Sequence, residues 1–322
     1  MAEFPAVAFS DRSHWGRIQV SGADRLRFLH NQSTNAFEQL SPGTGCETVF
    51  VSSTARTVDL ASAYVDDESV LLLVSPGMAA ELISWMDRYI FFADQVTLED
   101  RSETTFAITL LGPEVDRLLD QLGLPKPDMA PCSHTRGRLS IANATVQIAR
   151  DTGLTTSGYT LIGTKESGAQ PWLVQWLGDQ GVPCLSSQQW EVLRIQQGRP
   201  MPGQELTDQD NPLEAGLWHA ISFEKGCYIG QETIARLNTY QGVKKQLWGL
   251  KLGTPTTDVS LTLEGKPVGK ITSMVADDSG IWGLGYLRTK AGGAGLTVTV
   301  GETTADVVDL PFTSRGYLDG TA

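Results

Sequence analysis

The chain has 322 residues, which suggests about two domains at the usual domain size of roughly 150 residues. Hydrophobic residues make up 41% and charged residues 19%, a balance typical of a folded chain and too apolar for a disordered one. The 25 Lys and Arg against 37 Asp and Glu give a formal net charge of −12. This charge argues against a protein that binds nucleic acid by neutralising phosphates, and against a polybasic membrane binder.

The sequence also lacks the patterns of several other classes. No apolar stretch approaches the roughly 18 residues that a membrane span needs, and residues 1–10 lack the features of a signal peptide, so we expect a cytoplasmic protein. The four cysteines are Cys46, Cys132, Cys184 and Cys227, and none belongs to a C-x-x-C pair. Cys132 and His134 lie close in sequence but lack two further ligands nearby, so we predict no bound metal.

Short strands alternate with helices over the first third of the chain. We predict strands over 15–20, 46–51, 57–65, 70–74, 95–100 and 105–110, and helices after residue 24 and over 76–90 and 113–122. A polar run that includes Gln32 and Asn35 follows the first helix, and its side chains either bind a ligand or satisfy the loop's own backbone. The alternation favours an α+β fold.

The next segment begins as a linker, because three prolines lie within 124–131, and we place a break between two subdomains near 124–135. We predict strands over 139–150 and 158–163 and helices over 171–181 and 188–197. Six short alternating runs then follow, over 247–252, 259–263, 268–275, 281–287, 296–300 and 305–310. Such spacing predicts a small β-barrel or sandwich, with a domain boundary near residue 243.

The strongest local signal is an eight-residue segment around a cysteine. It consists of Lys225, Gly226, Cys227, Tyr228, Ile229, Gly230, Gln231 and Glu232. We predict that a helix begins at Glu232, so that Cys227 meets the positive end of the helix dipole as well as the charge of Lys225, and both effects favour the thiolate. The alternative is that Cys227 is a small, buried apolar residue.

This segment resembles the K-G-C-Y-I-G-Q-E signature of the YgfZ-type proteins, a branch of the aminomethyltransferase (glycine-cleavage T-protein) superfamily. Four further blocks resemble family motifs in the same order along the chain. They lie at 20–35 (V-x-G-x-D-x-x-x-F-L followed by Q-x-T-N), 193–200, 211–217 and 265–273. The cysteine signature is specific, whereas each of the other blocks is weak by itself.

The resemblance implies an α+β, aminomethyltransferase-like folate-binding fold, with an α+β region over 1–243 and a C-terminal β-barrel over 244–322 around a central hole. It implies a role in the assembly or maintenance of iron–sulfur enzymes, with an indirect effect on thiomethylation of transfer RNA. The implied cofactor is tetrahydrofolate or a derivative, and the implied partners are iron–sulfur client enzymes or assembly factors. Cys227, with Lys225, is the implied working group.

The sequence departs from the aminomethyltransferase pattern at several positions. Leu60 stands at the position of the transferases' folate-facing aspartate, and Asp59 is its neighbour in the predicted strand. Thr54-Ala55-Arg56 lacks the family's glycine, Ser75 replaces an asparagine, and Thr160 replaces the acid that follows Gly158-Tyr159. These departures argue against folate-dependent aminomethyl transfer.

The residues that remain as predicted folate contacts are Tyr159, Arg194, Arg236, Gln32 and Asn35. A tyrosine ring stacks on a pterin, and an arginine pairs with a carboxylate of the glutamate tail. For Arg194 the alternative is a salt bridge with Glu191, for Arg236 a similar exposed partner, and for Tyr159 a place in the core.

Three functions stay open at this point. In the first, Cys227 transfers a persulfide, ligates a cluster transiently, or is protected from oxidation, and a partner supplies further ligands because one thiol cannot hold a cluster. The second is a folate-dependent one-carbon transferase. The third is a non-catalytic adaptor whose acidic surface docks a client enzyme.

Overall fold

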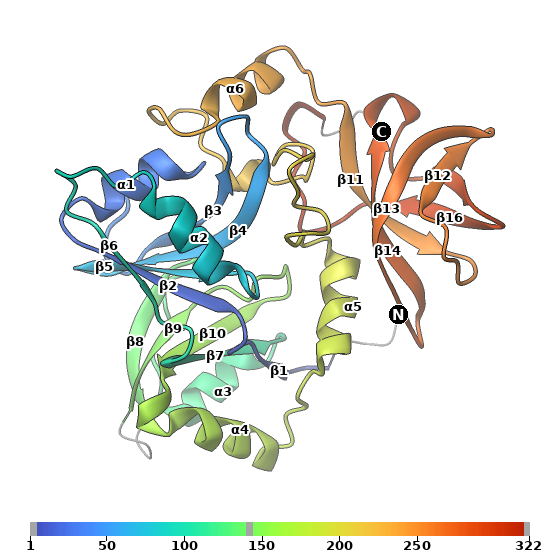
Figure 1. The fold of residues 1–322 in the computed structure, drawn as a ribbon. Coiled ribbons are helices and arrows are strands. Elements are labelled where there is room, and N and C mark those ends of the chain that lie inside the picture. The colour runs from blue at the N-terminus through green and yellow to red at the C-terminus, as the bar shows by residue number, and fades with distance from the viewer. Residues whose placement is uncertain (1–4, 140–143, 319–322) are drawn as a thin grey trace. The chain divides into compact units, whose positions relative to one another are not determined.

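Figure 1 shows the computed structural model of the chain, which describes residues 5–139 and 144–318. The described residues divide into two compact units. The first contains residues 5–48 and 60–186, and the second contains residues 49–59 and 187–318. Within the described ranges, no helix combines the length and apolar character that a membrane crossing requires.

Most of a first five-stranded sheet lies in the first unit. Its strands run in the order β3 (Gly45–Val51), β4 (Thr57–Val65), β5 (Ser69–Val74), β2 (Gly16–Ser21) and β6 (Thr97–Asp100). Alternate residues such as Ile18, Val20 and Leu72 are fully buried, as expected for strands with one face on a core. Helix α1 (Arg25–Gln32) contacts β5, and α2 (Met78–Asp87) lies against β2 and β6.

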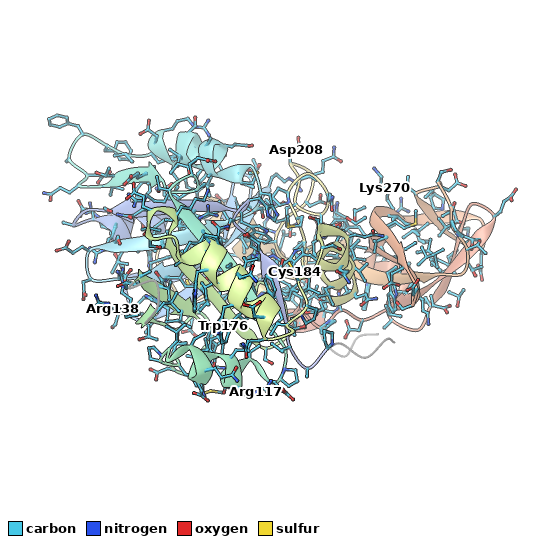
Figure 2. The ribbon with its side chains drawn as sticks, turned by 90° about the horizontal axis from the view of Figure 1, so that it is seen from below. Arg117, Arg138, Trp176, Cys184, Asp208 and Lys270 are labelled. Atoms are coloured by element: carbon cyan, nitrogen blue, oxygen red, sulfur yellow. The ribbon has the colours of Figure 1, made fainter. Side chains whose placement is uncertain are left out.

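A second five-stranded sheet completes this unit. Its order is β1 (Ala8–Asp11), β7 (Thr105–Leu111), β10 (Gly158–Thr164), β9 (Ala144–Ala149) and β8 (His134–Leu139). Two helices, α3 (Val115–Leu122) and α4 (Ala169–Asp179), contribute to the same apolar core. Leucines at helical spacing, Leu118 with Leu122 and Leu173 with Leu177, pack with Ile108 of β7. Trp176 extends from α4, as Figure 2 shows.

The second unit contains a closed barrel. Its strands follow the order β11 (Lys245–Leu252), β14 (Gly280–Arg288), β13 (Lys266–Asp277), β12 (Ser260–Leu263), β15 (Thr297–Val300) and β16 (Thr303–Val308). Leu250, Leu261 and Val300 lie in its core with no exposed surface. Helix α5 (Ser187–Gln197) contacts β13 and β14, and α6 (Gln231–Thr239) follows the cysteine segment. Among the described residues, short 3-10 helices lie at Lys165–Ser167 in the first unit and at Trp218–Ala220, Thr289–Ala291 and Gly316–Leu318 in the second.

The structure confirms the predicted α+β fold with its C-terminal barrel, and all six predicted barrel strands are present. Two strands were missed, β1 and β8. The strand predicted over 139–150 is divided: residue 139 ends β8, β9 begins at residue 144, and residues 140–143 lie outside the described residues. The compact units also differ from the predicted division at 243, because residues 49–59 and 187–243 belong with the barrel.

Asp66, in the turn between β4 and β5, gives a pH-dependent prediction. Its carboxylate accepts a hydrogen bond from Arg136 Nη2 at 2.7 Å and lies 3.6 Å from His134 Nε2. Burial opposes ionisation, but His134 and Arg136 hold the pKa of this carboxyl below its ordinary value of 3.8. Because the folded-state pKa is the lower one, the stabilisation is present above roughly pH 4 and disappears as the pH falls through the folded pKa.

We therefore expect Asp66→Asn to lower the free energy of unfolding by about 1 kcal/mol at pH 7 and by much less at pH 3. Urea denaturation at the two pH values measures the difference. The neighbouring Asp67→Asn is the matched control, because the Asp67 side chain is exposed and has no ion pair in the described part of the chain. An equal effect of both substitutions would show that the Asp66 contacts are not the cause.

Candidate functional site

The cysteine segment leads directly into α6. The helix begins at Gln231, one residue before the predicted start, and Glu232 is the acidic residue of its first turn. A carboxylate at that position interacts favourably with the positive end of the helix dipole. Gly230 is the residue that precedes the helix, and its φ of 82° lies in the left-handed region that favours glycine.

Gly230 also lies against the end of the hairpin formed by β3 and β4. A Cβ atom at this position would lie 2.8 Å from the carbonyl oxygen of Ser52 and 2.9 Å from Cγ2 of Val51. It would also lie 3.1 Å from Cα of Ala55, a fully buried residue with a φ of 59°. The segment is therefore fixed on the hairpin end by a backbone approach that a larger residue would prevent.

The hairpin end is itself held by hydrogen bonds. The Ser52 amide donates to the Arg56 carbonyl at 2.8 Å, and the Ala55 amide donates to the Ser52 carbonyl at 2.8 Å. Arg56 Nη1 donates to the Gln209 carbonyl at 2.9 Å, and the Thr57 amide donates to the Asp210 carbonyl at 3.0 Å. The cysteine segment thus rests on a turn that is joined to the loop after α5.

Cys227 is an exposed free cysteine, so the alternative of a buried apolar role is wrong. It precedes Gly230 by three residues and lies outside the first helical turn, where the dipole acts most strongly. The Nζ atom of Lys225 lies 4.5 Å from the centroid of the Tyr228 ring. Tyr228 is buried, and burial raises the pKa of its phenol. Tyr228 therefore anchors the segment, whereas the Cys227 side chain reaches solvent.

Arg194 lies in a buried network next to the barrel. Its guanidinium makes a bidentate pair with Glu191, from Nε at 2.7 Å and from Nη2 at 2.6 Å, and Nη1 donates to Glu205 Oε2 at 3.0 Å. Further bonds reach the Arg199 carbonyl, Gln204 Oε1 and Ser273 Oγ. Burial opposes the charge, but the two carboxylates raise the pKa of Arg194. The salt bridge between Arg194 and Glu191, which the sequence offered as the alternative to a folate contact, is therefore present.

Sequence reasoning missed Glu205, which is fully buried and is the second carboxylate of this network. Its side chain accepts hydrogen bonds from Thr272 Oγ1 at 2.7 Å and from Ser273 Oγ at 2.6 Å, both on β13. The Met201 amide donates to it at 3.1 Å. Glu205 lies in an irregular loop, where no periodic pattern signals burial, and the network favours a structural role for Arg194.

Tyr159 is also enclosed, with 1% of its surface exposed. Its hydroxyl donates to Asp116 Oδ1 at 2.7 Å and accepts from Arg150 Nη2 at 2.7 Å. Burial, together with the bond to Asp116, raises the pKa of this phenol to about 12. The ring belongs to the core of α3, α4 and the second sheet, which matches the core alternative from the sequence.

The other predicted contacts differ in their surroundings. The Asn35 side chain donates to the Glu47 carbonyl at 2.8 Å and accepts from the Ala36 amide, so it orders its own loop. Gln32 is buried, and its Oε1 atom has no hydrogen-bond partner within residues 5–139 and 144–318. Arg236 is exposed on α6. The predicted residues are divided between the two units, with Gln32, Asn35 and Tyr159 in the first and the remainder in the second.

Neither Leu60 nor Asp59 has exposed surface on β4. Among residues 5–139 and 144–318, no group of three or more His, Cys, Asp and Glu side chains is arranged to hold a metal ion.

Residues 4–225 match the family described as the GCVT N-terminal domain. The chain belongs to this family. It is 42% identical over 315 residues to a chloroplastic protein of Arabidopsis thaliana named as a transferase, covering 97% of this chain and 72% of the relative. It is 28% identical over 321 residues to the aminomethyltransferase of Halalkalibacterium halodurans, covering 95% of this chain and 86% of that protein.

The fold of this GCVT-family chain is similar to that of a solved structure. The crystal structure of the glycine cleavage system aminomethyltransferase T from Bartonella henselae aligns with a TM-score of 0.82 and 21% sequence identity. The alignment covers 96% of this chain and 87% of that one. The predicted aminomethyltransferase-like fold is therefore confirmed, whereas the assignment to the YgfZ-type branch stays a prediction.

Proposed function

We propose that this GCVT-family protein supports the assembly or maintenance of iron–sulfur enzymes through the thiol of Cys227. The observation that supports the proposal is the exposure of this thiol on a segment that is anchored directly after the cysteine, by the buried Tyr228 and by Gly230 against the hairpin. Cysteine thiolates are the usual ligands of iron–sulfur clusters. If Cys227 supplies one ligand, the client supplies the ligands for the remaining iron coordination positions. An effect on thiomethylation of transfer RNA would be indirect, through such a client.

Lys225 places an ammonium group two residues from the cysteine, and its contact with the Tyr228 ring holds that charge on the same segment. A nearby positive charge attracts an anionic cluster that is bound at the segment. We therefore assign Lys225 a positioning and electrostatic role beside Cys227.

A reduced folate is part of the proposal only through the family. The residues predicted for tetrahydrofolate do not fit that role well, because Tyr159, Arg194 and Asn35 already direct their polar groups to protein partners. Gln32, whose Oε1 atom has no partner in the described part of the chain, and the exposed Arg236 are the predicted contacts whose polar groups remain available. We assign the folate no step in the function, and equilibrium binding of tetrahydrofolate to the purified protein tests the ligand itself.

The deciding experiment compares variants in cells that lack the protein. We expect wild-type protein to restore aconitase-type [4Fe–4S] enzyme activity under oxidative stress, and Cys227→Ser to restore less than a tenth of it. The matched control is Cys184→Ser, which removes the other exposed free cysteine, in the segment after α4 (Figure 2). Full rescue by Cys227→Ser would overturn the proposal, as would equal failure of both variants.

A folate-dependent one-carbon transferase is the second candidate, because the family contains aminomethyltransferases such as that of Halalkalibacterium halodurans. Formation of methylenetetrahydrofolate from an aminomethyl donor by the purified protein would support it.

The location of the protein in the cell is a separate proposal: we predict the cytoplasm, whereas the Arabidopsis relative is named as chloroplastic. Fractionation of the source cells tests it.

A further inference from the structure

The loop between α2 and β6, residues 88–96, exposes two consecutive aromatic side chains. Phe91 has an exposed fraction of 73%, and Phe92 is fully exposed. Large apolar side chains that adjoin one another at the surface often mark a site of protein association, because their exposure to water is unfavourable. Neither phenylalanine belongs to the unit that contains the cysteine segment.

Hydrogen bonds fix the backbone of this loop. The Phe91 amide donates to Asp94 Oδ2 at 2.9 Å, and the Asp94 amide donates to the Phe91 carbonyl at 2.9 Å. Arg27 of α1 pairs with Asp94 at 3.1 Å. The two phenylalanines are therefore presented on an ordered turn, and a partner that binds them need not order the loop first.

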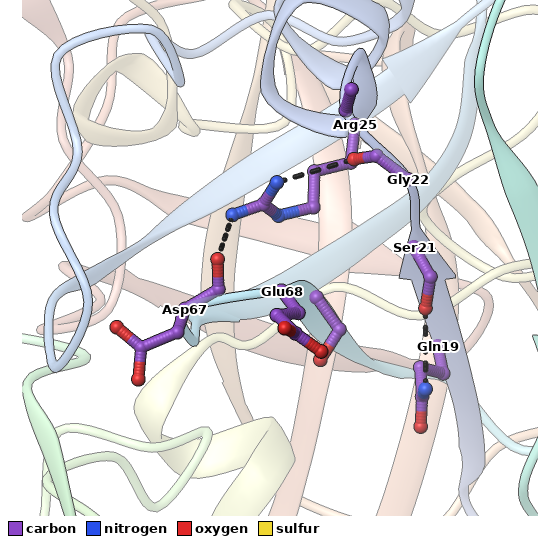
Figure 3. Close-up of a pocket in the computed structure, with 8 residues that line it drawn as sticks. Gln19, Ser21, Gly22, Arg25, Asp67 and Glu68 are labelled. Atoms are coloured by element: carbon purple, nitrogen blue, oxygen red, sulfur yellow. Dashed lines mark hydrogen bonds between the residues drawn. The ribbon is translucent and has the colours of Figure 1, made fainter.

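A polar pocket of about 500 Å³ lies near the start of α1. As Figure 3 shows, Gln19 and Ser21 form one side of the pocket, and Asp67 and Glu68 form another. The Arg25 guanidinium lies between Gly22 and Asp67. Arg25 donates to the Gly22 carbonyl at 3.2 Å and to the Asp67 carbonyl. Because these bonds go to the backbone, the carboxylates of Asp67 and Glu68 have no ion-pair partner among the described residues.

The pocket and the phenylalanine loop are attached to the same turn, residues 21–25. The Asp24 amide donates to the Gln95 carbonyl at 3.2 Å, and Asp24 Oδ2 accepts from the Gln95 amide at 2.9 Å. Gly22 lines the pocket and lies so close to Gln95 that an added Cβ would be 2.1 Å from its carbonyl oxygen. The two features therefore form one continuous part of the first unit.

We propose that loop 88–96 and this pocket are a docking surface for a protein partner that carries apolar side chains beside a lysine or arginine. Phe91 and Phe92 supply the apolar contact, and the basic side chain pairs with the solvent-exposed carboxylates of Asp67 and Glu68 rather than with the part of the pocket that Arg25 lines. The chain's net charge of −12 favours a basic partner and opposes a second copy of itself. The unpaired acids likewise oppose an anionic lipid surface. This surface goes beyond the proposed thiol function and does not depend on it.

The probe is a fluorescein-labelled synthetic peptide of leucines and lysines, titrated against the full chain by fluorescence anisotropy. We expect at least tenfold weaker binding to Phe91→Ser/Phe92→Ser and to Asp67→Asn/Glu68→Gln. Glu264→Gln/Glu302→Gln removes the same charge from two exposed barrel positions and is expected to bind as wild type does. Peptides with glutamate for lysine, or serine for leucine, are expected to bind at least tenfold more weakly.

Three results would overturn the proposal. The first is no binding of the leucine–lysine peptide at 1 mM protein, taken as roughly the weakest useful affinity. The second is equal weakening by the barrel variant, which indicates general charge attraction. The third is full binding by the Phe91→Ser/Phe92→Ser protein. Circular dichroism of each variant checks the fold, which these exposed positions should leave intact. Because Cys227 is unchanged throughout, failure here leaves the rescue experiment unaffected.

Discussion

Replacing Arg194 by methionine is expected to lower the free energy of unfolding of the barrel-containing unit by about 3–5 kcal/mol. The substitution leaves Glu205, which has no exposed surface, without its cationic partner. A buried carboxylate that loses its counter-charge suffers the full cost of leaving water. Urea unfolding, with hydrogen exchange of β13 as a local measure, gives the size of the effect.

Two further variants separate a structural role for Arg194 from a ligand-binding one. Arg194→Met combined with Glu205→Leu removes both charges and should regain a large part of the lost stability. Arg101→Met breaks a pair with Glu99 at 2.9 Å, where both side chains are partly exposed, and should cost about 1 kcal/mol or less. A stable Arg194→Met protein that has lost tetrahydrofolate binding would instead support the folate contact predicted from the sequence.

Gly230→Ala is expected to destabilise the cysteine segment by about 2–4 kcal/mol. Roughly 1–2 kcal/mol comes from the left-handed backbone, and a similar amount comes from the clash with the hairpin end. The local effect should appear as faster hydrogen exchange over 225–240. We also expect this variant to rescue iron–sulfur enzyme activity poorly although its thiol is retained, because the segment would no longer be seated on the hairpin.

Gly203→Ala is the matched control. Its φ of 76° is close to the 82° of Gly230, and it lies in the same unit, but an added Cβ would meet nothing within 4 Å. It should therefore show the backbone strain alone, about 1–2 kcal/mol, with unchanged exchange at the cysteine segment. Equal changes for the two glycines would show that the approach to Ser52 has no energetic weight.

The barrel was predictable from sequence because its strands alternate and end at turns. Glu264-Gly265 separates β12 from β13, Ser279 lies between β13 and β14, and Gly280 begins β14; Gly265 and Gly280 both have positive φ. Strand β8 lacks this signal, since its sequence HTRGRL contains two arginines and a glycine. It is a strand because every one of its residues pairs with β9. The partner is the next strand along the chain, and this pairing leaves no alternating apolar pattern within β8 itself.

In the candidate site, too, some contacts follow from a local sequence pattern and others do not. The Arg194–Glu191 pair is three residues apart on one helix, and helical geometry alone predicts it. The contacts that decide the role of Tyr159 come from Asp116 on α3 and Arg150 after β9, which no spacing rule joins. Sequence likewise located Cys227 within its motif, but its exposure depends on the position of the segment on the hairpin.

The closed barrel has a consequence for how this protein can associate with other chains. Since every barrel strand has two neighbours, no backbone edge is left there for another strand to extend. The open edges belong to the two sheets, and charged side chains occupy two of them, Glu99 and Asp100 on β6 and Arg136 and Arg138 on β8. At β1, the Phe9 amide bonds to Pro183 and its carbonyl to Leu185. These features protect three of the four sheet edges against strand-to-strand association, and at those edges they leave side-chain contacts as the means of recognising a partner.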